Sequence, residues 1–187
     1  MIPIFEQLSG SGQGYAQDEF LHRFEEICQQ HLREKRARAF AFIFYDPSHG
    51  RVREALRNHA GFQRLDDTSD NDVSLFFMHD NAVERGWRRF NKKFLRAANI
   101  SDLVTLPCML FFRFDSGDFC DANILILDEK NKDPVTLTND MVHFLKANIG
   151  AMNKEGDMSA LKAIPELIFS AGKFGSLVSF FEKFWKP

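Results

Sequence analysis

The nearly unbroken apolar run Ala39-Phe-Ala-Phe-Ile-Phe-Tyr45 constrains the fold more than any other feature of the sequence. A run of this length that stops at Asp46-Pro47 is typical of a β-strand covered on both faces, because a half-exposed strand would alternate apolar and polar residues. The run belongs to a larger excess, since the chain has 21 Phe against 2 Tyr and 2 Trp. Phe carries no polar group for a solvated surface, so this excess predicts a large apolar core or a buried partner surface.

Helical and strand patterns alternate along the rest of the chain. Apolar spacing predicts helices over about 18–35, 51–60, 82–98 and 138–148, and strands over 39–45, 72–78, 108–114 and 121–127. The last two strands flank a tight turn at 115–118 and are therefore expected to form a hairpin. Strands that alternate with helices favour parallel pairing, whereas the hairpin adds antiparallel strands. The sequence therefore predicts an α/β fold with a mixed sheet and helices on both faces.

The length of 187 residues favours one domain with terminal additions. We expect a flexible N-terminal segment over 1–17, an α/β domain over 18–157 and an apolar helical extension over 158–187. The Gly-rich stretch Ser9–Gly14 is interpreted as a linker, because it lacks the Gly-Lys-Ser/Thr ending of a phosphate-binding loop.

The order of elements over about 38–150 resembles the thioredoxin-like superfamily. The segment 101–112, with Pro107 just before a strand, is similar to the one in which that family uses a cis-proline to open its third core strand. The resemblance implies a thioredoxin-like mixed sheet, a cis bond at Pro107, and an N-terminal helix and a C-terminal extension outside the shared part. Where the family carries its redox motif, this chain has Tyr45-Asp-Pro-Ser-His-Gly50, which contains no cysteine. We therefore expect a degenerate member without dithiol oxidoreductase activity.

The polar residues that follow the first two predicted strands are the candidates for catalysis. The implied topology gathers them at one edge of the sheet, near Leu106 and Pro107. They are Asp46, Ser48, His49, His79 and Asp80. A His beside a carboxylate can act as a general base, and Ser48 could serve as a nucleophile. The alternative is that Asp-Pro-Ser is a turn and that the residues after His79 cap the next helix, which needs no catalysis.

Neither a cofactor nor a metal is predicted. His49 and His79 lack the close paired spacing of a structural metal site. Of the three cysteines, Cys28 and Cys108 fall on apolar patterns that favour burial, and Cys120 has no C-x-x-C partner. Unpaired thiols, the absence of a secretory signal at the start and the absence of a long apolar run predict a cytoplasmic protein without a transmembrane segment.

The net charge of −2 hides strong segregation. Residues 33–64 carry eight basic and three acidic side chains, 65–81 carry five Asp and no base, and 82–98 carry six bases and one acid. The basic helix over 85–96 is the candidate anion or nucleic-acid site, through Arg88, Arg89, Lys92 and Lys93. The alternative is an ordinary solvated helix face that is partly neutralised by Asp66, Asp67, Asp70 and Asp72.

The extension over 158–187 is apolar almost all round if it is helical. Such a helix has to be buried on more than one side, and it lacks the rich basic face of a membrane-surface helix, so we expect a protein partner or a homo-oligomer. Its candidate contact residues are Phe169, Phe174, Phe180, Phe181, Phe184 and Trp185. The first hypothesis is a redox-inactive, thioredoxin-like binding or assembly module. The alternatives are an enzyme of unknown reaction that uses the His/Asp cluster, and an anion or nucleic-acid binder.

Overall fold

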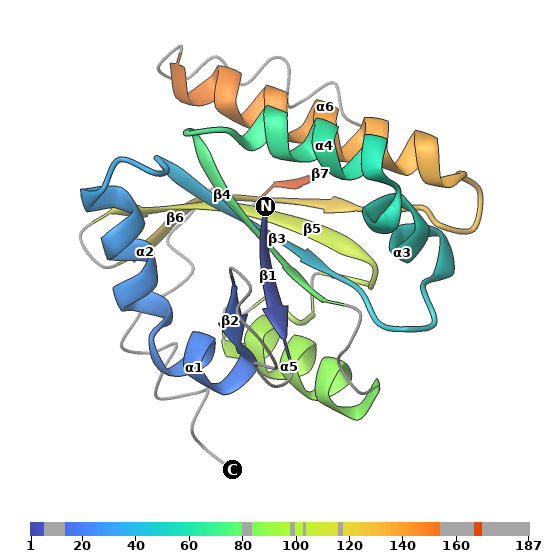
Figure 1. Cartoon of the computed structure of the whole chain (residues 1–187), viewed down its shortest axis with the longest axis horizontal. Helices are drawn as coiled ribbons and strands as arrows, with labels where there is room; N and C mark the ends of the chain where they lie inside the picture. The colour runs from blue at the N-terminus through green and yellow to red at the C-terminus, as the bar shows by residue number, and fades with distance from the viewer. Residues whose placement is uncertain are drawn as a thin grey trace.

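The computed structural model describes residues 1–5, 14–79, 84–97, 100–102, 104–115, 118–153 and 167–169. Its centre is a seven-stranded mixed sheet in the order β2-β1-β4-β3-β5-β6-β7. Helices α3, α4 and α6 cover one face, and α1, α2 and α5 cover the other (Figure 1). The predicted α/β class with helices on both faces of a mixed sheet is therefore confirmed.

The elements have the following bounds. The strands are β1 (Ile2–Phe5), β2 (Tyr15–Ala16), β3 (Ala39–Phe44), β4 (Val73–Met78), β5 (Cys108–Asp115), β6 (Asp118–Ile126) and β7 (Leu167–Phe169). The helices are α1 (Gln17–His22), α2 (Phe24–Arg33), α3 (Gly50–Arg57), α4 (His59–Ser69), α5 (Glu84–Ala97) and α6 (Pro134–Asn153). All four predicted strands are present, and the last two form the expected antiparallel hairpin.

The sheet topology brings several strand ends to one edge. Strand β4 lies between β1 and β3 and runs parallel to both. Strand β5 runs antiparallel to β3, with Cys108 opposite Phe44, so the start of β5 lies beside the end of β3. The Leu106–Pro107 peptide bond just before β5 is cis, as the family resemblance implied. The carboxyl ends of β1, β3 and β4 therefore share one edge with Pro107.

A layer of Phe side chains fills the space between the sheet and α1, α2 and α5. Nine of its rings belong to residues that the structure describes; all nine are fully buried, and neighbouring rings have centroid distances from 4.3 to 6.3 Å. They are Phe20, Phe24, Phe40, Phe42, Phe44, Phe76, Phe90, Phe94 and Phe112. The alternation along β3 places its three Phe on this face because successive strand residues point to opposite faces.

The opposite face of β3 presents Ala39, Ala41 and Ile43, which are also fully buried. Helices α3, α4 and α6 contact one another above this face. Gly61 of α4 allows one close approach, because an added Cβ would lie 2.7 Å from the carbonyl oxygen of Ala55 in α3. Small residues of β3 and the glycine of α4 therefore allow a close approach at this part of the second layer.

The N-terminal segment was predicted to be flexible, and this prediction was wrong for Ile2–Phe5, which form β1 inside the sheet. The parallel ladder with β4 orders these four residues. Ile4 accepts a hydrogen bond from the backbone N–H of His79 (2.7 Å), so the nitrogen of Pro3 faces away from β4. Pro3, which has no N–H to donate, is therefore tolerated in an interior strand.

Two helix predictions also need correction. The helix expected over 18–35 is divided into α1 and α2 at Arg23, whose backbone leaves the helical region (φ −112°, ψ 13°). The helix expected over 51–60 ends at Arg57, and a second helix, α4, follows from His59. The Asn58 side chain starts α4 by accepting from the backbone N–H groups of Ala60 (3.0 Å) and Gly61 (3.3 Å).

The helix predicted over 158–187 is wrong for residues 167–169. Residues 167–169 form β7, which pairs antiparallel with β6, with Asn123 opposite Phe169. Without β7, β6 would leave a row of unpaired backbone groups at the sheet edge. Residues 154–166 and 170–187 lie outside the described residues. Within the described part of the chain, none of the helices has the length and hydropathy needed to cross a bilayer.

Candidate functional site

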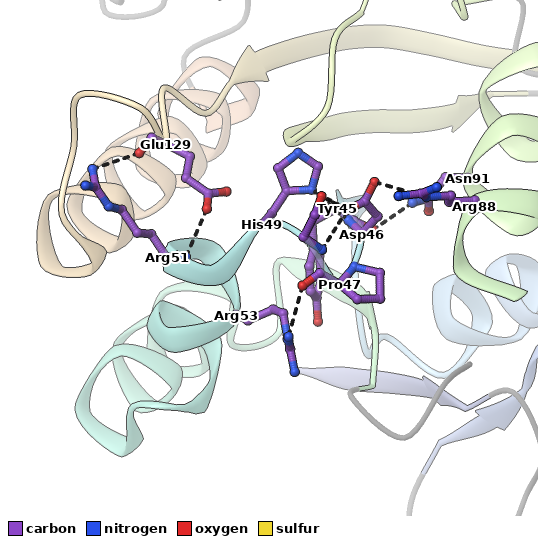
Figure 2. A network of polar contacts seen from close by, with 10 residues as sticks. Tyr45, Asp46, Pro47, His49, Arg51, Arg53, Arg88, Asn91 and Glu129 are labelled. Atoms are coloured by element: carbon purple, nitrogen blue, oxygen red, sulfur yellow. Dashed lines mark hydrogen bonds and ion pairs between the residues drawn. The ribbon is translucent and has the colours of Figure 1, made fainter. Parts of the chain in front are cut away.

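The turn between β3 and α3 contains three of the candidate residues. The Asp46 carboxylate accepts hydrogen bonds from the backbone N–H of Ser48 (2.8 Å) and from the Ser48 hydroxyl. His49 Nδ1 accepts from the backbone N–H of Asp46 (3.0 Å) and lies 3.1 Å from Asp46 Oδ1. Figure 2 shows Asp46 and His49 close together where β3 ends. The turn therefore satisfies its own polar groups.

Tyr45 anchors this turn to the neighbouring elements. Its hydroxyl donates to the carbonyl oxygen of Met78 at the end of β4 (2.5 Å). Its carbonyl oxygen accepts from the Asn91 side chain of α5 (2.7 Å), and its ring meets Trp87 edge-on at 4.5 Å. Burial raises the pKa of the Tyr45 hydroxyl far above its ordinary value, so this group is a neutral donor. The end of β3 is thus fixed to both β4 and α5.

The start of α3 is held by residues from outside the turn (Figure 2). Arg53 Nη1 donates to the Pro47 carbonyl oxygen (2.9 Å). The backbone N–H of Arg51 donates to the Glu129 carboxylate (3.0 Å), and Arg51 Nη1 donates to the carbonyl oxygens of Glu129, Lys130 and Lys132. These contacts tie α3 to the loop that precedes α6.

The bonds within the turn do not form a nucleophile–base pair. The Ser48 hydroxyl donates to Asp46, whereas an activated serine would donate to an imidazole nitrogen. Partial burial raises the pKa of Asp46, but hydrogen bonds from Ser48 and the nearby His49 and Arg88 outweigh it and leave the pKa below its usual value. A carboxylate of lowered pKa is a weak base, so the contacts favour the turn interpretation over catalysis by these residues.

His79 faces a different set of residues, in a pocket of about 380 Å³. The pocket is lined by Pro3, Phe5, Tyr45, Arg53, Leu56, Arg57, His59, Phe62, Phe77 and His79. The structure thus divides the predicted cluster: Asp46, Ser48 and His49 form the turn, while His79 lines the pocket. Asp80 lies outside the described residues. The sequence interpretation missed the pocket residues of α3 and α4, because α4 itself was not predicted.

Burial and a nearby positive charge set the protonation state of His79. Its ring lies 4.8 Å from that of Phe5, and its Nδ1 atom is buried without a hydrogen-bond partner in the described part of the chain. Burial lowers the pKa of His79, and the positive charge of Arg57 lowers it further. His79 is therefore mainly neutral near pH 7.

The described residues provide neither a metal site nor a reactive thiol. Among them, no group of three or more His, Cys, Asp or Glu could hold a metal ion. Cys28 and Cys108 are buried, as predicted, and burial raises the pKa of both thiols. The Cys120 side chain is not described. The two described thiols are therefore protonated at neutral pH and shielded from solvent.

Helix α5 presents its basic residues to solvent. Arg88, Arg89, Lys92 and Lys93 are exposed, whereas Trp87, Phe90 and Phe94 are buried in the aromatic layer, as predicted. Arg88 Nε lies 3.7 Å from the Asp46 carboxylate, and the Arg88 side chain is 60% exposed.

The acidic stretch does not neutralise this basic face, contrary to the alternative raised from the sequence. Asp66 and Asp67 lie on α4, which covers the other face of the sheet (Figure 1). Asp66 pairs with the N-terminal amine, and Asp72 pairs with Arg38. The acidic stretch and α5 are close in sequence but lie in different layers, because β4 carries the chain from one face of the sheet to the other.

One of the candidate partner residues, Phe169, lies in β7 at the edge of the sheet opposite β2. Phe169 belongs to β7 and pairs through its backbone with Asn123. The other candidates, Phe174, Phe180, Phe181, Phe184 and Trp185, lie outside the described residues. In comparisons with known proteins, the chain matches no family model, no curated protein and no solved structure. Function is therefore argued from the turn, the pocket, α5 and the sheet edge.

Proposed function

We propose that the chain is a thioredoxin-like protein that has no dithiol chemistry and acts by binding. The observation that carries the proposal is the turn after β3. At the place where thioredoxin-like proteins carry their redox motif, Asp46, Ser48 and His49 bond to one another. The cis bond at Pro107 and the position of β5 beside the end of β3 support the same assignment.

Installing the missing thiols tests this assignment. The double variant D46C/H49C places a Cys-Pro-Ser-Cys sequence before α3, where the helix N-terminus lowers the pKa of a thiol. We expect the variant to catalyse reduction of a protein disulfide by dithiothreitol, whereas the unmodified chain does not. The single variant D46C, which lacks the resolving thiol, is the control. If the folded double variant shows no activity, the turn is not equivalent to the redox site.

We further propose that residues 158–187 supply the contact to a second protein chain. Two observations support this contact: β7 joins the segment to the β6 edge, and the residues after it are rich in Phe. Apolar side chains on a segment next to a sheet edge favour association between chains. The first partner to test is a second copy of this chain.

The full chain with Phe180, Phe181 and Phe184 all replaced by Ser tests the contact. Static light scattering should show an oligomer for the unmodified chain and a monomer for the triple variant. The variant E182Q/K183Q changes the same segment without removing apolar surface and should retain the oligomer. An unmodified chain that stays monomeric would exclude self-association.

A second candidate function is anion or nucleic-acid binding by α5. The specific observation is that its basic face lies away from the acidic residues of α4. Retardation of duplex DNA at two salt concentrations tests this function. The variant R89Q/K92Q should weaken binding and reduce the salt dependence by about one unit of slope for each lost phosphate contact. R64Q on α4 is the control, and absence of retardation at low salt would exclude this function.

A further inference from the structure

The pocket beside His79 combines a buried apolar floor with a basic rim. The floor is formed by Tyr45, Leu56 and Phe77, which are all buried. Half-buried Phe62 extends this floor and meets Phe77 edge-on, with ring centroids 6.0 Å apart. At the rim, Arg57 and His59 are exposed to solvent. A ligand that fits both parts has an apolar body and a polar head.

The basic residues at the rim favour a negatively charged head on the ligand. Arg53 and Arg57 lie one turn apart on α3 and both line the pocket. Both guanidinium groups lower the pKa of the Tyr45 hydroxyl, and Arg57 lowers that of His79. Their positive charge therefore acts on polar groups inside the pocket. Arginine pairs preferentially with carboxylate and phosphate oxygens.

The interior of the pocket also has an unsatisfied polar atom. His79 Nδ1 is buried without a hydrogen-bond partner in the described residues. The His79 ring packs beside Phe5, and its backbone N–H donates to Ile4, so strands β1 and β4 fix its position. Buried polar atoms in proteins are nearly always hydrogen-bonded, so this nitrogen is suited to a polar group of a ligand.

We propose that this pocket binds an organic anion that has a single carboxylate or phosphate head on an apolar chain or ring. The head pairs with Arg57 and approaches His79, and the apolar body covers Phe62 and Phe77. The volume of about 380 Å³ lies in the range of small-molecule sites. This site is independent of the proposed contact at 158–187 and of the missing redox motif, so its failure would leave both unaffected.

Calorimetry on the full chain with four probes tests the proposal. Octanoate and octyl phosphate share an apolar chain and differ in the head, octanol lacks the charge, and acetate lacks the chain. We expect at least one of the two charged amphiphiles to bind about tenfold or more tightly than octanol and acetate. A factor of this size corresponds to the binding free energy of about one charge-assisted hydrogen bond. The tighter of the two heads identifies the ligand as a carboxylic acid or a phosphate monoester.

Variants and an internal reporter locate the binding. R57Q should weaken binding of the charged amphiphile about tenfold and leave octanol unchanged, and F62S should weaken both. R64Q and E54Q alter exposed charges of α4 and α3 that do not line the pocket, and they should retain binding. In NMR spectra, the ring signals of His79 should shift on binding, while those of buried His31 should not. An affinity for octanol that equals or exceeds that for both octanoate and octyl phosphate, an R57Q variant that binds like the unmodified chain, or no binding of any probe would overturn the proposal.

Discussion

The two faces of the central sheet are filled in different ways, although one strand supplies both. On the face toward α1, α2 and α5, β3 presents Phe40, Phe42 and Phe44 to a layer of nine rings. On the other face it presents Ala39, Ala41 and Ile43 to α3, α4 and α6. The first face gains its stability from ring area, and the second depends on close approach between helices.

The two faces of the sheet also differ in the candidate binding surfaces that they carry. The pocket opens on the second face, where α3 and α4 meet the ends of β1 and β4. The aromatic face holds the rings of α5 in place, so the basic residues of that helix point to solvent. Candidate binding surfaces therefore lie on both sides, and the pocket on the second side combines charge with an apolar cavity.

Replacing Phe42 should break the aromatic face and have the largest effect. Its ring lies within 6.3 Å of Phe20, Phe44, Phe76, Phe90 and Phe94. F42A should lower the free energy of unfolding by about 3–5 kcal/mol, because it removes buried area and leaves a cavity. Urea denaturation measures this change.

The neighbouring residue provides the control for the other face. Ile43 is equally buried but points toward α3, α4 and α6, and I43V should cost only about 0.5–1.5 kcal/mol. If F42A costs no more than I43V, the layer of rings does not dominate the stability of its face.

The second face should be broken by adding a single methyl group. In G61A the new Cβ would lie 2.7 Å from the Ala55 carbonyl oxygen and 3.1 Å from Thr138 Oγ1. We expect a loss of about 1–3 kcal/mol from overpacking, although Ala is the better helix former. Thermal and urea unfolding measure the loss.

Gly150 of α6 is the matched control, because no atom of the described residues lies within 4 Å of an added Cβ there. G150A should stabilise the protein by up to about 1 kcal/mol through helix propensity alone. A stabilising G61A would show that α3, α4 and α6 can move apart at no cost.

Local patterns were sufficient to predict the elements whose residues carry their own signal. The continuous apolar run predicted β3, and the stripe of Trp87, Phe90 and Phe94 predicted α5 with the correct buried face. Strand β1 was missed because four residues with a Pro carry little signal of their own and are ordered by pairing with β4 and β2. Strand β7 was missed for the same reason, since its order depends on β6.

The candidate site was predictable only in part. The sequence placed His79 at the carboxyl edge of the sheet, and the structure confirms its position after β4. Arg53, Arg57 and Phe62 join it because α3 ends at Arg57 and α4 lies over β4, which no local pattern showed. The basic face of α5 was predicted correctly, but its separation from the acidic stretch required the layer arrangement.

The Asn58 cap tests how far α4 depends on a local signal. N58A removes the hydrogen bonds to the N–H groups of Ala60 and Gly61 and should cost about 1 kcal/mol. N58D restores an acceptor at the same position and should recover most of the loss. If N58A is neutral in urea denaturation, packing alone defines the start of α4.

The smallest effect concerns pH, because each face holds one His of lowered pKa. On the aromatic face, burial lowers the pKa of His31, which hydrogen-bonds Ser74 (2.7 Å). On the second face, burial and Arg57 lower that of His79. In the folded protein, the pKa of each His lies below the ordinary value of 6.5. Between the folded-state pKa and 6.5, the unfolded chain therefore binds more protons than the folded protein. Stability should therefore fall as pH drops below about 6.5.

Urea denaturation between pH 7.5 and 5.5 separates the two contributions, because carboxyl groups do not titrate strongly there. The slope cannot exceed about 1.4 kcal/mol per pH unit for each His. H79Q should remove the part that comes from the second face and retain the part from His31. An anion bound beside His79 would favour its protonated form and so raise its pKa in the folded protein. Saturating octanoate should therefore reduce the contribution of His79 to the pH dependence of the unfolding free energy. An unfolding free energy that is constant over this pH range would show that neither face holds its His in the neutral form.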